Sequence, residues 1–321
     1  MQRIAITGSS GYLGGKLIEG LRQRDPSQKI LGLDIKSAKA NVPDQFVAAD
    51  IRDPKIGEAL RDFRPDTVIH AAFAFQPLHD DRLMHSINVE GFENLLRAVT
   101  EVRPQRLNII SSATAFGAWP DNPVPIPDGS PVRGRSDFRY SADKAEVEKI
   151  INKFAQAHAE MAVSWVRPAI IIGPNIENFL TRFIFGMPIL VRLDGVETVT
   201  QFVHEHDVTA AILEILGRNG RGGFNVGPPD WITVTELAKA TKRHCINLPF
   251  WLCRYCAALA WFVRLPIHET PPTFLYFARH PWVVVSNRLQ DEMGFQFRYS
   301  SLQTMNDYLN AKKQASKNRN Q

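Results

Sequence analysis

The stretch ITGSSGYLGGKL, residues 6–17, decides the fold that we expect of this chain. It follows the apolar run RIAIT, residues 3–7, which is typical of a buried strand, and it opens a segment with helical spacing at 15–23. Glycine at such a turn permits a positive φ, glycine at the loop centre lets backbone N–H groups approach a pyrophosphate, and glycine in the first helical turn allows close packing on the strand. The loop supplies these glycines as Gly8, Gly11 and Gly14. The stretch therefore predicts a dinucleotide-binding turn.

Apolar runs and helical segments alternate along the first two-thirds of the chain. The further runs typical of buried strands are KILGLD at 29–34, FVAAD at 46–50, TVIHAA at 67–72, RLNIISS at 106–112 and MAVSWVRP at 161–168. The alternation predicts an α/β fold, a Rossmann-type doubly wound parallel sheet with a smaller mixed α/β lobe at the C-terminal end. We expect a nucleotide-binding domain at 1–174, to which 198–227 return, a substrate-binding lobe at 175–321, and a disordered basic tail at 311–321.

The carboxylate of Asp34 indicates which dinucleotide is bound. Asp34 ends the second predicted strand, twenty residues after Gly14. A carboxylate at this offset accepts hydrogen bonds from the adenosine ribose hydroxyls and repels a 2′-phosphate. Lys36 and Lys39, which lie nearby in the sequence, would instead attract such a phosphate. On balance the sequence favours NAD as the cofactor over NADP.

Composition and charge argue against several classes of protein. Of the 321 residues, 44% are hydrophobic and 22% are charged, which is typical of a folded globular protein. The formal charge of +5 comes from 38 Lys and Arg against 33 Asp and Glu, but four of the bases and none of the acids lie in 311–321, which leaves 34 against 33 elsewhere. We therefore expect no nucleic-acid partner. The chain opens on an apolar strand without an export signal, so we expect a cytoplasmic protein.

A strongly apolar segment, PFWLCRYCAALAWFVRLP at 249–266, leaves two interpretations open. It is interrupted by Arg254 and Arg264 and is short for a membrane span. We expect a buried or pocket-lining helix, with contact to a membrane surface as the alternative. Cys253 and Cys256 form a CxxC pair within it, but a zinc site would need two further ligands, so we expect buried thiols.

Further motifs follow the glycine loop in a characteristic order. They are AADIRD at 48–53, VIHAA at 68–72, IISSATAFG at 109–117, FRYSADKAEVEKI at 138–150, VRPAIIIGP at 166–174 and QFVHEHDVTAAI at 201–212. With the spacing TGxxGxxG that begins at Thr7, they make residues 1–227 similar to the extended short-chain dehydrogenases, the NAD-dependent epimerase/dehydratase family. The resemblance implies that the cofactor contacts Gly8, Ser10, Gly11, Tyr12, Leu13, Gly14, Asp34, Asp50, Ile51, Ala71, Ala72, Asn88, Tyr140, Lys144 and Pro168.

Tyr140 and Lys144 carry the chemistry that we expect. They are four residues apart on a predicted helix, so their side chains share a face. A phenol titrates at about pH 10, and a neighbouring ammonium favours the phenolate, which would lower the pKa of Tyr140 toward that of a useful general base. The resemblance implies that Tyr140 takes the proton from a substrate hydroxyl as hydride is transferred. It also implies that Lys144 holds the nicotinamide ribose and that Ser112 bonds the same substrate oxygen.

The run His204, Glu205, His206 and Asp207 could be read as a metal cluster. Alternate positions of an extended chain point the same way, so only His204 and His206 share a face, and a third convergent ligand is not evident. We therefore expect no metal. The resemblance places these residues in the segment that joins the two lobes.

Three functions remain open within the resemblance. Dehydration is disfavoured, because dehydratases of the family carry an acidic pair after the serine position, whereas Ala113 and Thr114 follow Ser112 here. A sugar-nucleotide 4-epimerase is one reading, although Thr200 stands where such enzymes usually have a phosphate-binding arginine. The RxGD-like segment that such enzymes carry near the C-terminus is also not recognisable, and Arg279 is a candidate substitute for its arginine. The others are an NAD(P)-dependent dehydrogenase or reductase of a less polar, steroid-like hydroxy or keto substrate, and a non-catalytic dinucleotide sensor. The expected partner of the enzyme is a small-molecule substrate, and relatives often form homodimers.

Overall fold

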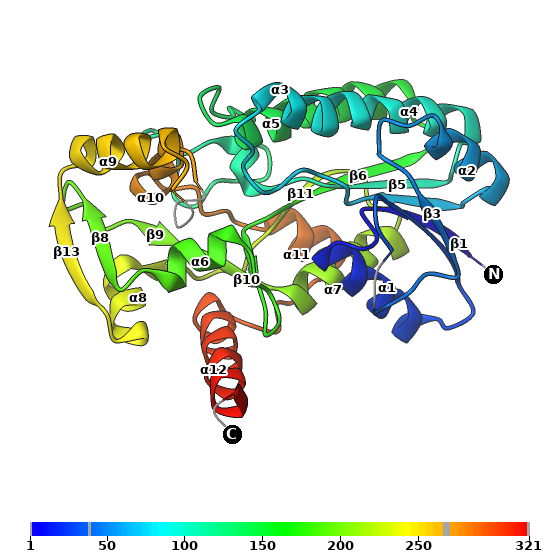
Figure 1. The fold of residues 1–321 in the computed structure, drawn as a ribbon. Coiled ribbons are helices and arrows are strands. Elements are labelled where there is room, and N and C mark those ends of the chain that lie inside the picture. The colour runs from blue at the N-terminus through cyan, green and yellow to red at the C-terminus, as the bar shows by residue number, and fades with distance from the viewer. Residues whose placement is uncertain (1, 38–39, 266–269, 320–321) are drawn as a thin grey trace.

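A computed structural model describes residues 2–37, 40–265 and 270–319 (Figure 1). At its centre is a seven-stranded parallel sheet with the strand order β11-β6-β5-β4-β1-β2-β3. The strands are β1 (Arg3–Thr7), β2 (Lys29–Asp34), β3 (Gln45–Ala48), β4 (Thr67–His70), β5 (Arg106–Ile110), β6 (Ala162–Pro168) and β11 (Gly222–Val226). The strand order reverses at β1, so the carboxyl ends of β1 and β4 border the crevice in which such folds bind ligands. This is the predicted Rossmann-type sheet.

The central strands of this sheet consist mostly of buried residues, whereas the edge strand β3 has none. Every residue of β4 and of β6 is buried. Continuous burial of this kind is characteristic of parallel sheets that are covered by helices on both sides. The six runs that the sequence predicts as strands in this part of the chain are confirmed as β1 to β6.

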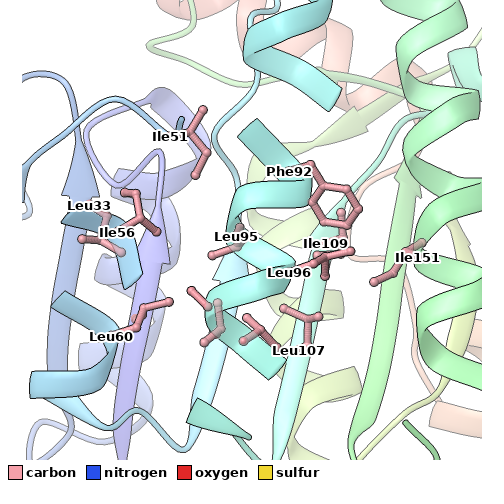
Figure 2. Packing of buried hydrophobic residues seen from close by; sticks show 14 of the residues in the cluster. Leu33, Ile51, Ile56, Leu60, Phe92, Leu95, Leu96, Leu107, Ile109 and Ile151 are labelled. Atoms are coloured by element: carbon pink, nitrogen blue, oxygen red, sulfur yellow. The ribbon is translucent and has the colours of Figure 1, made fainter. Parts of the chain in front are cut away.

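One face of the sheet is covered by α2 (Lys55–Phe63), α4 (Gly91–Val102) and α5 (Arg139–Ala157) (Figure 1). Helix α2 shows how the sequence directs this packing. Its apolar residues Ile56, Leu60 and Phe63 recur at helical spacing and are the residues that it buries. Figure 2 shows Ile56 and Leu60 in the same cluster as Leu95 of α4 and Leu107 of β5. This apolar layer fixes the helices against the sheet.

The opposite face is covered by α1 (Tyr12–Arg24), α7 (Glu205–Gly217) and α11 (Asn287–Met293). Residues 198–227 therefore supply a covering helix and the edge strand β11. The sequence analysis assigned α11 to the substrate lobe, and this assignment is wrong. Leu289 and Met293 are buried in the same cluster as Ile212 of α7 and Phe224 of β11, which holds α11 against the large sheet.

A smaller region of short strands and helices follows β6. Its elements are β7 (Ile170–Ile172), α6 (Phe179–Gly186), β8 (Ile189–Leu193), β9 (Val199–Thr200), β10 (Phe202–His204), β12 (Ile232–Thr233), α8 (Val234–Thr241), β13 (His244–Leu248), α9 (Phe250–Phe262), η3 (Pro272–Phe274) and α10 (Leu275–Arg279). Strand β7 pairs with β10, β9 with β12, and β8 with β13. The connections after β4 and β5 contain α3 (Asp81–His85), η1 (Ser86–Glu90) and η2 (Ala113–Phe116).

The C-terminal residues form α12 (Ser301–Arg319), which projects from the rest of the molecule (Figure 1). The sequence predicts a disordered tail at 311–321, and this is wrong for the residues up to Arg319. Met305 and Tyr308 bury the first half of the helix against β7 and β10. The alanines and lysines that follow are good helix formers, so the helix continues beyond its buried part. Residues 320–321 lie outside the described residues.

Candidate active site

The glycine loop brings β1, α1 and the end of β4 close together. Gly8 has a φ of +70°, and a Cβ at this position would lie 2.5 Å from the backbone nitrogen of Ala72. A Cβ on Gly14 would lie 2.1 Å from the carbonyl oxygen of Gly8. Both positions therefore require glycine. Gly11 precedes α1 and provides no side-chain cap, so backbone N–H groups of the first turn are the groups offered to an anion.

A cavity of about 460 Å³ opens beside this loop and falls in the size range of small-molecule sites. It is lined by Thr7, Gly8, Ser10, Gly11, Leu33, Asp34, Ile35, Lys36, Ala49, Asp50, Ile51, Ile56, Ala71, Ala72, Phe73, Ala74 and Ile87. The lining includes the predicted cofactor contacts Gly8, Ser10, Gly11, Asp34, Asp50, Ile51, Ala71 and Ala72. The close backbone approaches and this cavity fit a bound dinucleotide.

Two carboxylates are fixed at the rim of the cavity. Asp34 accepts hydrogen bonds from the backbone N–H of Ser10 at 3.0 Å and from its neighbour Ile35 at 2.7 Å, which ties the glycine loop to the end of β2. Asp50 pairs with Arg52 at 2.7 Å, and hydrogen bonds from that side chain lower the pKa of the Asp50 carboxyl. Lys36 also lines the cavity, whereas Lys39 lies outside the described residues.

Other predicted cofactor contacts do not line this cavity. Among them are Tyr12, Leu13, Gly14, Asn88 and Pro168. Tyr12 and Leu13 pack into apolar clusters beside α1, and Pro168 is buried at the end of β6. The Oδ1 atom of Asn88 accepts a hydrogen bond from the backbone of a cavity residue, Ala74, at 2.7 Å. Direct contact of these five residues with a cofactor stays a prediction.

The three predicted catalytic residues come together from two elements. Ser112 follows β5 and precedes η2, and its Oγ accepts hydrogen bonds from the backbone N–H and the hydroxyl of Thr114, at 3.2 and 2.9 Å. Tyr140 and Lys144 lie one turn apart in α5. The side chains of Ser112 and Thr114 lie beside the phenol of Tyr140 and favour its ionised form. The sequence analysis missed Thr114, although its place two residues after the serine was the available signal.

The pKa of Tyr140 is displaced in the direction opposite to the one predicted. Burial raises this pKa, and the neighbouring side chains of Ser112 and Thr114 oppose the shift only in part. The Lys144 ammonium does not reverse it: Nζ lies 5.7 Å from the Tyr140 ring centre and 3.4 Å from that of Phe73. The Nζ atom donates to the carbonyl oxygen of Ile110 at 2.8 Å. The neutral phenol is therefore the favoured form in this structure.

Two carboxylates of α5 surround Lys144. Burial lowers the pKa of Lys144 to about 7, and the charges of Glu148 and Asp143 oppose this shift. Glu148 is buried and accepts a hydrogen bond from Arg167 at 2.8 Å, and Asp143 is buried and accepts one from Asn88 at 3.0 Å. The sequence analysis did not identify either carboxylate, although Glu148 follows Lys144 at the spacing that places two side chains on one helix face.

Aromatic side chains enclose Tyr140. The ring centres of Phe73 and Phe75 each lie 5.5 Å from that of Tyr140, and the ring centre of Phe138 lies 6.1 Å away. Phe274 of η3 continues this layer at 5.8 Å from Phe138. We call these four phenylalanines the aromatic wall. It makes the surroundings of the phenol apolar.

One group of potential metal ligands, within 4.8 Å of one another, occurs among the described residues: His85, Asp143 and Glu146. Asp143 already pairs with Arg139 at 2.9 Å and is hydrogen-bonded to His85 at 2.9 Å. These contacts account for the clustering of the side chains without an ion, and we assign the group a structural role.

Residues 204–207 hold the start of α7 against the segment that precedes α12. The run is not extended as predicted, because His204 ends β10 and Glu205 begins α7. The ring centres of His204 and His206 nevertheless lie 4.9 Å apart. His204 also stacks on Tyr299 at 3.9 Å, and Asp207 accepts hydrogen bonds from the backbone N–H groups of Arg298 and Tyr299, both at 3.0 Å. The run therefore ties α7 to the segment that precedes α12.

The candidate phosphate-binding arginine is engaged within the protein. Arg279 pairs with Asp194 at 2.6 Å, and its guanidinium lies 4.8 Å from the ring centre of Phe250. Thr200, at the position of the expected arginine, lies in β9 opposite Ile232. These two positions therefore offer no free cation to a diphosphate.

The apolar segment 249–266 is not the buried helix that the sequence analysis favoured. Helix α9 buries only Ala257, whereas Trp251 and Phe262 are 69% and 84% exposed. The expectation of buried thiols is also wrong, because Cys253 is half-buried and Cys256 is exposed. Hydrophobic composition predicts a helix here but cannot show whether other elements cover it. Within the described ranges of the chain, no helix is long and apolar enough to cross a membrane.

Residues 4–227 match the model of the NAD dependent epimerase/dehydratase family. The matched range holds the glycine loop, the parallel sheet and the cluster of Ser112, Tyr140 and Lys144. The chain belongs to this family. Its membership confirms the resemblance drawn from the motif order and makes NAD the cofactor.

Similar proteins extend the likeness over nearly the whole chain. A protein of Mycobacterium tuberculosis (strain ATCC 25618 / H37Rv), described only as uncharacterized, is 24% identical over 95% of this chain and 82% of its own length. A 4-hydroxy-2-methyl-3-oxo-4-farnesyl-3,4-dihydroquinoline-1-oxide ketoreductase of Stigmatella aurantiaca is 26% identical over 94% of each chain. The crystal structure of UDP-glucose-4-epimerase from Stenotrophomonas maltophila, with bound NAD and formylated UDP-arabinopyranose, superposes with a TM-score of 0.74 at 17% identity and covers 99% of each chain. This structural likeness shows the shared fold.

Proposed function

We propose that the chain transfers hydride between NAD and the carbon of a secondary alcohol or ketone, at a site formed by Ser112, Tyr140 and Lys144. NAD accepts or supplies the hydride when it is bound. The observation that carries the proposal is that the hydroxyls of Ser112 and Thr114, which are hydrogen-bonded to each other, lie beside the Tyr140 phenol, one helical turn from Lys144. The family membership supports the same class of chemistry.

In this proposal, Tyr140 and Lys144 transfer the proton that accompanies the hydride. A substrate oxygen held by the hydroxyls of Ser112 and Tyr140 would be polarised by both. The raised pKa of Tyr140 keeps the phenol protonated, so it is suited to give a proton to a ketone oxygen as the carbon is reduced. Lys144, whose pKa lies at about 7, is suited to return a proton to the phenol near neutral pH. These properties favour the reductive direction.

The surroundings of the site favour an apolar substrate. The aromatic wall surrounds Tyr140, and Arg279 pairs with Asp194. Arg135 is likewise paired, with Asp137 at 2.7 Å. An apolar, steroid-like hydroxy or keto compound therefore suits this chain better than a nucleotide diphosphate. The relative named as a ketoreductase of a farnesyl-bearing quinoline oxide supports this choice.

Epimerisation of a sugar nucleotide is the second candidate. The fold shared with the UDP-glucose-4-epimerase of Stenotrophomonas maltophila favours it. The same three side chains would then act twice, with NAD kept in place between the two hydride transfers. Thr200, in place of the expected arginine, counts against this candidate.

An assay of NADH oxidation with apolar ketones, run beside an assay of UDP-glucose 4-epimerisation, tests the proposal. We expect the wild-type chain to consume NADH with an apolar ketone. Tyr140→Phe should lower kcat by at least about 100-fold, because a general acid contributes about 10²- to 10⁴-fold. The Kd for NADH should change little. Tyr308→Phe, the same substitution in α12, is the matched control and should retain activity.

Unchanged turnover in Tyr140→Phe would overturn the assigned chemistry. Conversion of UDP-glucose to its 4-epimer without net release of NADH would instead establish the second candidate.

A further inference from the structure

Helix α9 presents an apolar outer face that no described element covers. Residues 251, 255, 258, 259 and 262 recur at helical spacing and are Trp251, Tyr255, Ala258, Leu259 and Phe262. The exposed fractions of the four large side chains are 69%, 68%, 54% and 84%, in that order. We call these five residues the α9 face. It carries no charged side chain.

Side chains on the inner side of α9 pack against the rest of the molecule. Phe250 packs on Tyr276 with ring centres 5.1 Å apart, Ala257 is buried, and Trp261 stacks on His79 at 3.8 Å. Figure 1 shows the helix along the outside of the smaller region, at the end remote from the N-terminus. The α9 face is therefore held outward by the packing of the helix.

The composition of the α9 face suits the interface of a lipid bilayer. Trp and Tyr combine an apolar ring with a polar atom and are enriched at the level of the lipid headgroups. Phe and Leu on the same face can enter the boundary of the acyl chains. Helix α9 has 13 residues, fewer than the roughly 20 that a span requires, so such a helix would lie in the plane of the interface.

The charges of this part of the chain point to an anionic surface. The sequence between Glu236 and Glu269 contains no acidic residue. Its basic residues are Lys239, Lys242, Arg243, Arg254 and Arg264. Arg254 and Arg264, within α9 and just beyond it, are exposed. Basic residues beside a membrane-facing helix are attracted to anionic headgroups.

The same charges disfavour a second copy of the chain as the occupant. In a two-fold symmetric dimer, the α9 face would pack on its own counterpart and bring Arg254 of one copy toward Arg254 of the other. Two acidic side chains near α9 are already engaged. Asp194 pairs with Arg279, and Asp80 accepts hydrogen bonds from the first turn of α3.

We propose that α9 is an interfacial anchor that docks this chain on the surface of an anionic lipid bilayer. The anchor adjoins the candidate active site, because α9 contacts η3 and Phe274 of η3 belongs to the aromatic wall. On the proposed function, an apolar ketone dissolved in the bilayer would therefore reach Tyr140 from the docked side. That consequence rests on the proposed function, whereas docking itself does not.

Flotation of the full chain with vesicles tests the anchor. The probes are vesicles of phosphatidylcholine alone and of phosphatidylcholine with phosphatidylglycerol. We expect the chain to float with the anionic vesicles, more weakly with the neutral ones, and less as salt is added. The double variant Trp251→Ser/Phe262→Ser should lose at least about 10-fold in affinity. Leu302→Ser, which changes an exposed leucine of α12, is the matched control and should bind as the wild type does.

The outcomes separate the anchor from its alternatives. Absence of flotation by the folded wild type, or equal binding of the double variant, would overturn the proposal. A dimer that forms without lipid and is lost in the double variant, in the absence of vesicle binding, would assign the α9 face to a second copy.

The variant Arg254→Gln tests the preference for anionic lipid. It should weaken binding to anionic vesicles only, and equal wild-type binding to both kinds of vesicle would overturn the anionic preference. None of these assays needs a substrate, so their failure is distinguishable from failure of the proposed function.

Discussion

Tyr140 and Lys144 have pKa values that are displaced in opposite directions for the same reason. Burial favours the neutral form of each group, which raises the pKa of the phenol and lowers that of the amine to about 7. The sequence predicted that these residues would share a helix face, and they do lie one turn apart. It could not predict the direction of the Tyr140 shift, which depends on burial and on the contacts of Nζ with Phe73 and Ile110.

The lowered pKa of Lys144 predicts how folding stability depends on pH. Between about pH 7 and about pH 10, the unfolded chain binds a proton on this amine that the folded chain does not. The contribution of Lys144 to the free energy of unfolding therefore rises with pH in this window, by at most about 1.4 kcal/mol per pH unit. Denaturant titrations of the wild type and of Lys144→Met at pH 7, 8 and 9 measure it. The stability of the variant relative to the wild type should fall as pH rises, and parallel pH profiles would contradict the assignment.

Asp34 is predicted to set the preference for NAD over NADP. Asp34→Asn retains a hydrogen-bond acceptor for the N–H of Ser10 and removes the charge that repels a 2′-phosphate, while Lys36 remains at the cavity. The ratio of the Kd for NADPH to that for NADH should fall by about 10-fold, as measured by fluorescence titration. Asp53→Asn, which removes a carboxylate outside the cavity, should leave the ratio unchanged. Equal ratios in the wild type and Asp34→Asn would refute this role.

At the scale of elements, the approach of α1 to the glycine loop is the contact on which the cofactor site depends. A Cβ at Gly14 would meet the Gly8 carbonyl oxygen, whereas a Cβ at Gly15 would have nothing closer than 3.8 Å, a side-chain atom of Asn41. The two adjacent glycines of α1 therefore differ in the space available to a side chain.

Substitution of the two glycines by alanine tests this difference. Gly14→Ala should lower the free energy of unfolding by about 1–3 kcal/mol and weaken NAD binding by at least about 10-fold, because the backbone must shift. Gly15→Ala should stabilise the chain by about 0.5–1 kcal/mol through helix propensity and leave binding intact. Thermal unfolding and NAD titration of both variants provide the measurement. Similar behaviour of the two variants would show that the close approach is not needed.

The sequence predicts less about elements that pack against residues far away along the chain. The pattern of apolar runs identified β1 to β6, because each strand coincides with a local apolar run. The assignment of α11 to the substrate lobe failed, because Leu289 and Met293 pack against elements that come much earlier in the chain. The expectation that α9 is buried also failed, because an apolar helix has the same sequence pattern whether other elements cover it or leave it exposed.

At the scale of the whole molecule, the family match ends at residue 227, close to the end of β11. The cofactor half of the site could therefore be predicted from motifs that lie within single turns and helices. The elements η3, α9 and α10, to which we assign the proposed substrate half, follow that point. They carry Phe274, which belongs to the aromatic wall, and Arg279, which pairs with Asp194. Sequence spacing carries little information about such long-range contacts, so the proposed substrate class is argued from the structure.

NAD bound between the glycine loop and its cavity is the first requirement of the chemistry proposed at Tyr140. Isothermal titration calorimetry of NAD into the full chain, freed of any bound nucleotide, tests it most directly. We expect one NAD bound per chain, with binding retained in Tyr140→Phe and strongly weakened in Gly14→Ala. A folded wild-type chain that binds no NAD would rule out both the assigned cofactor site and the hydride transfer that depends on it.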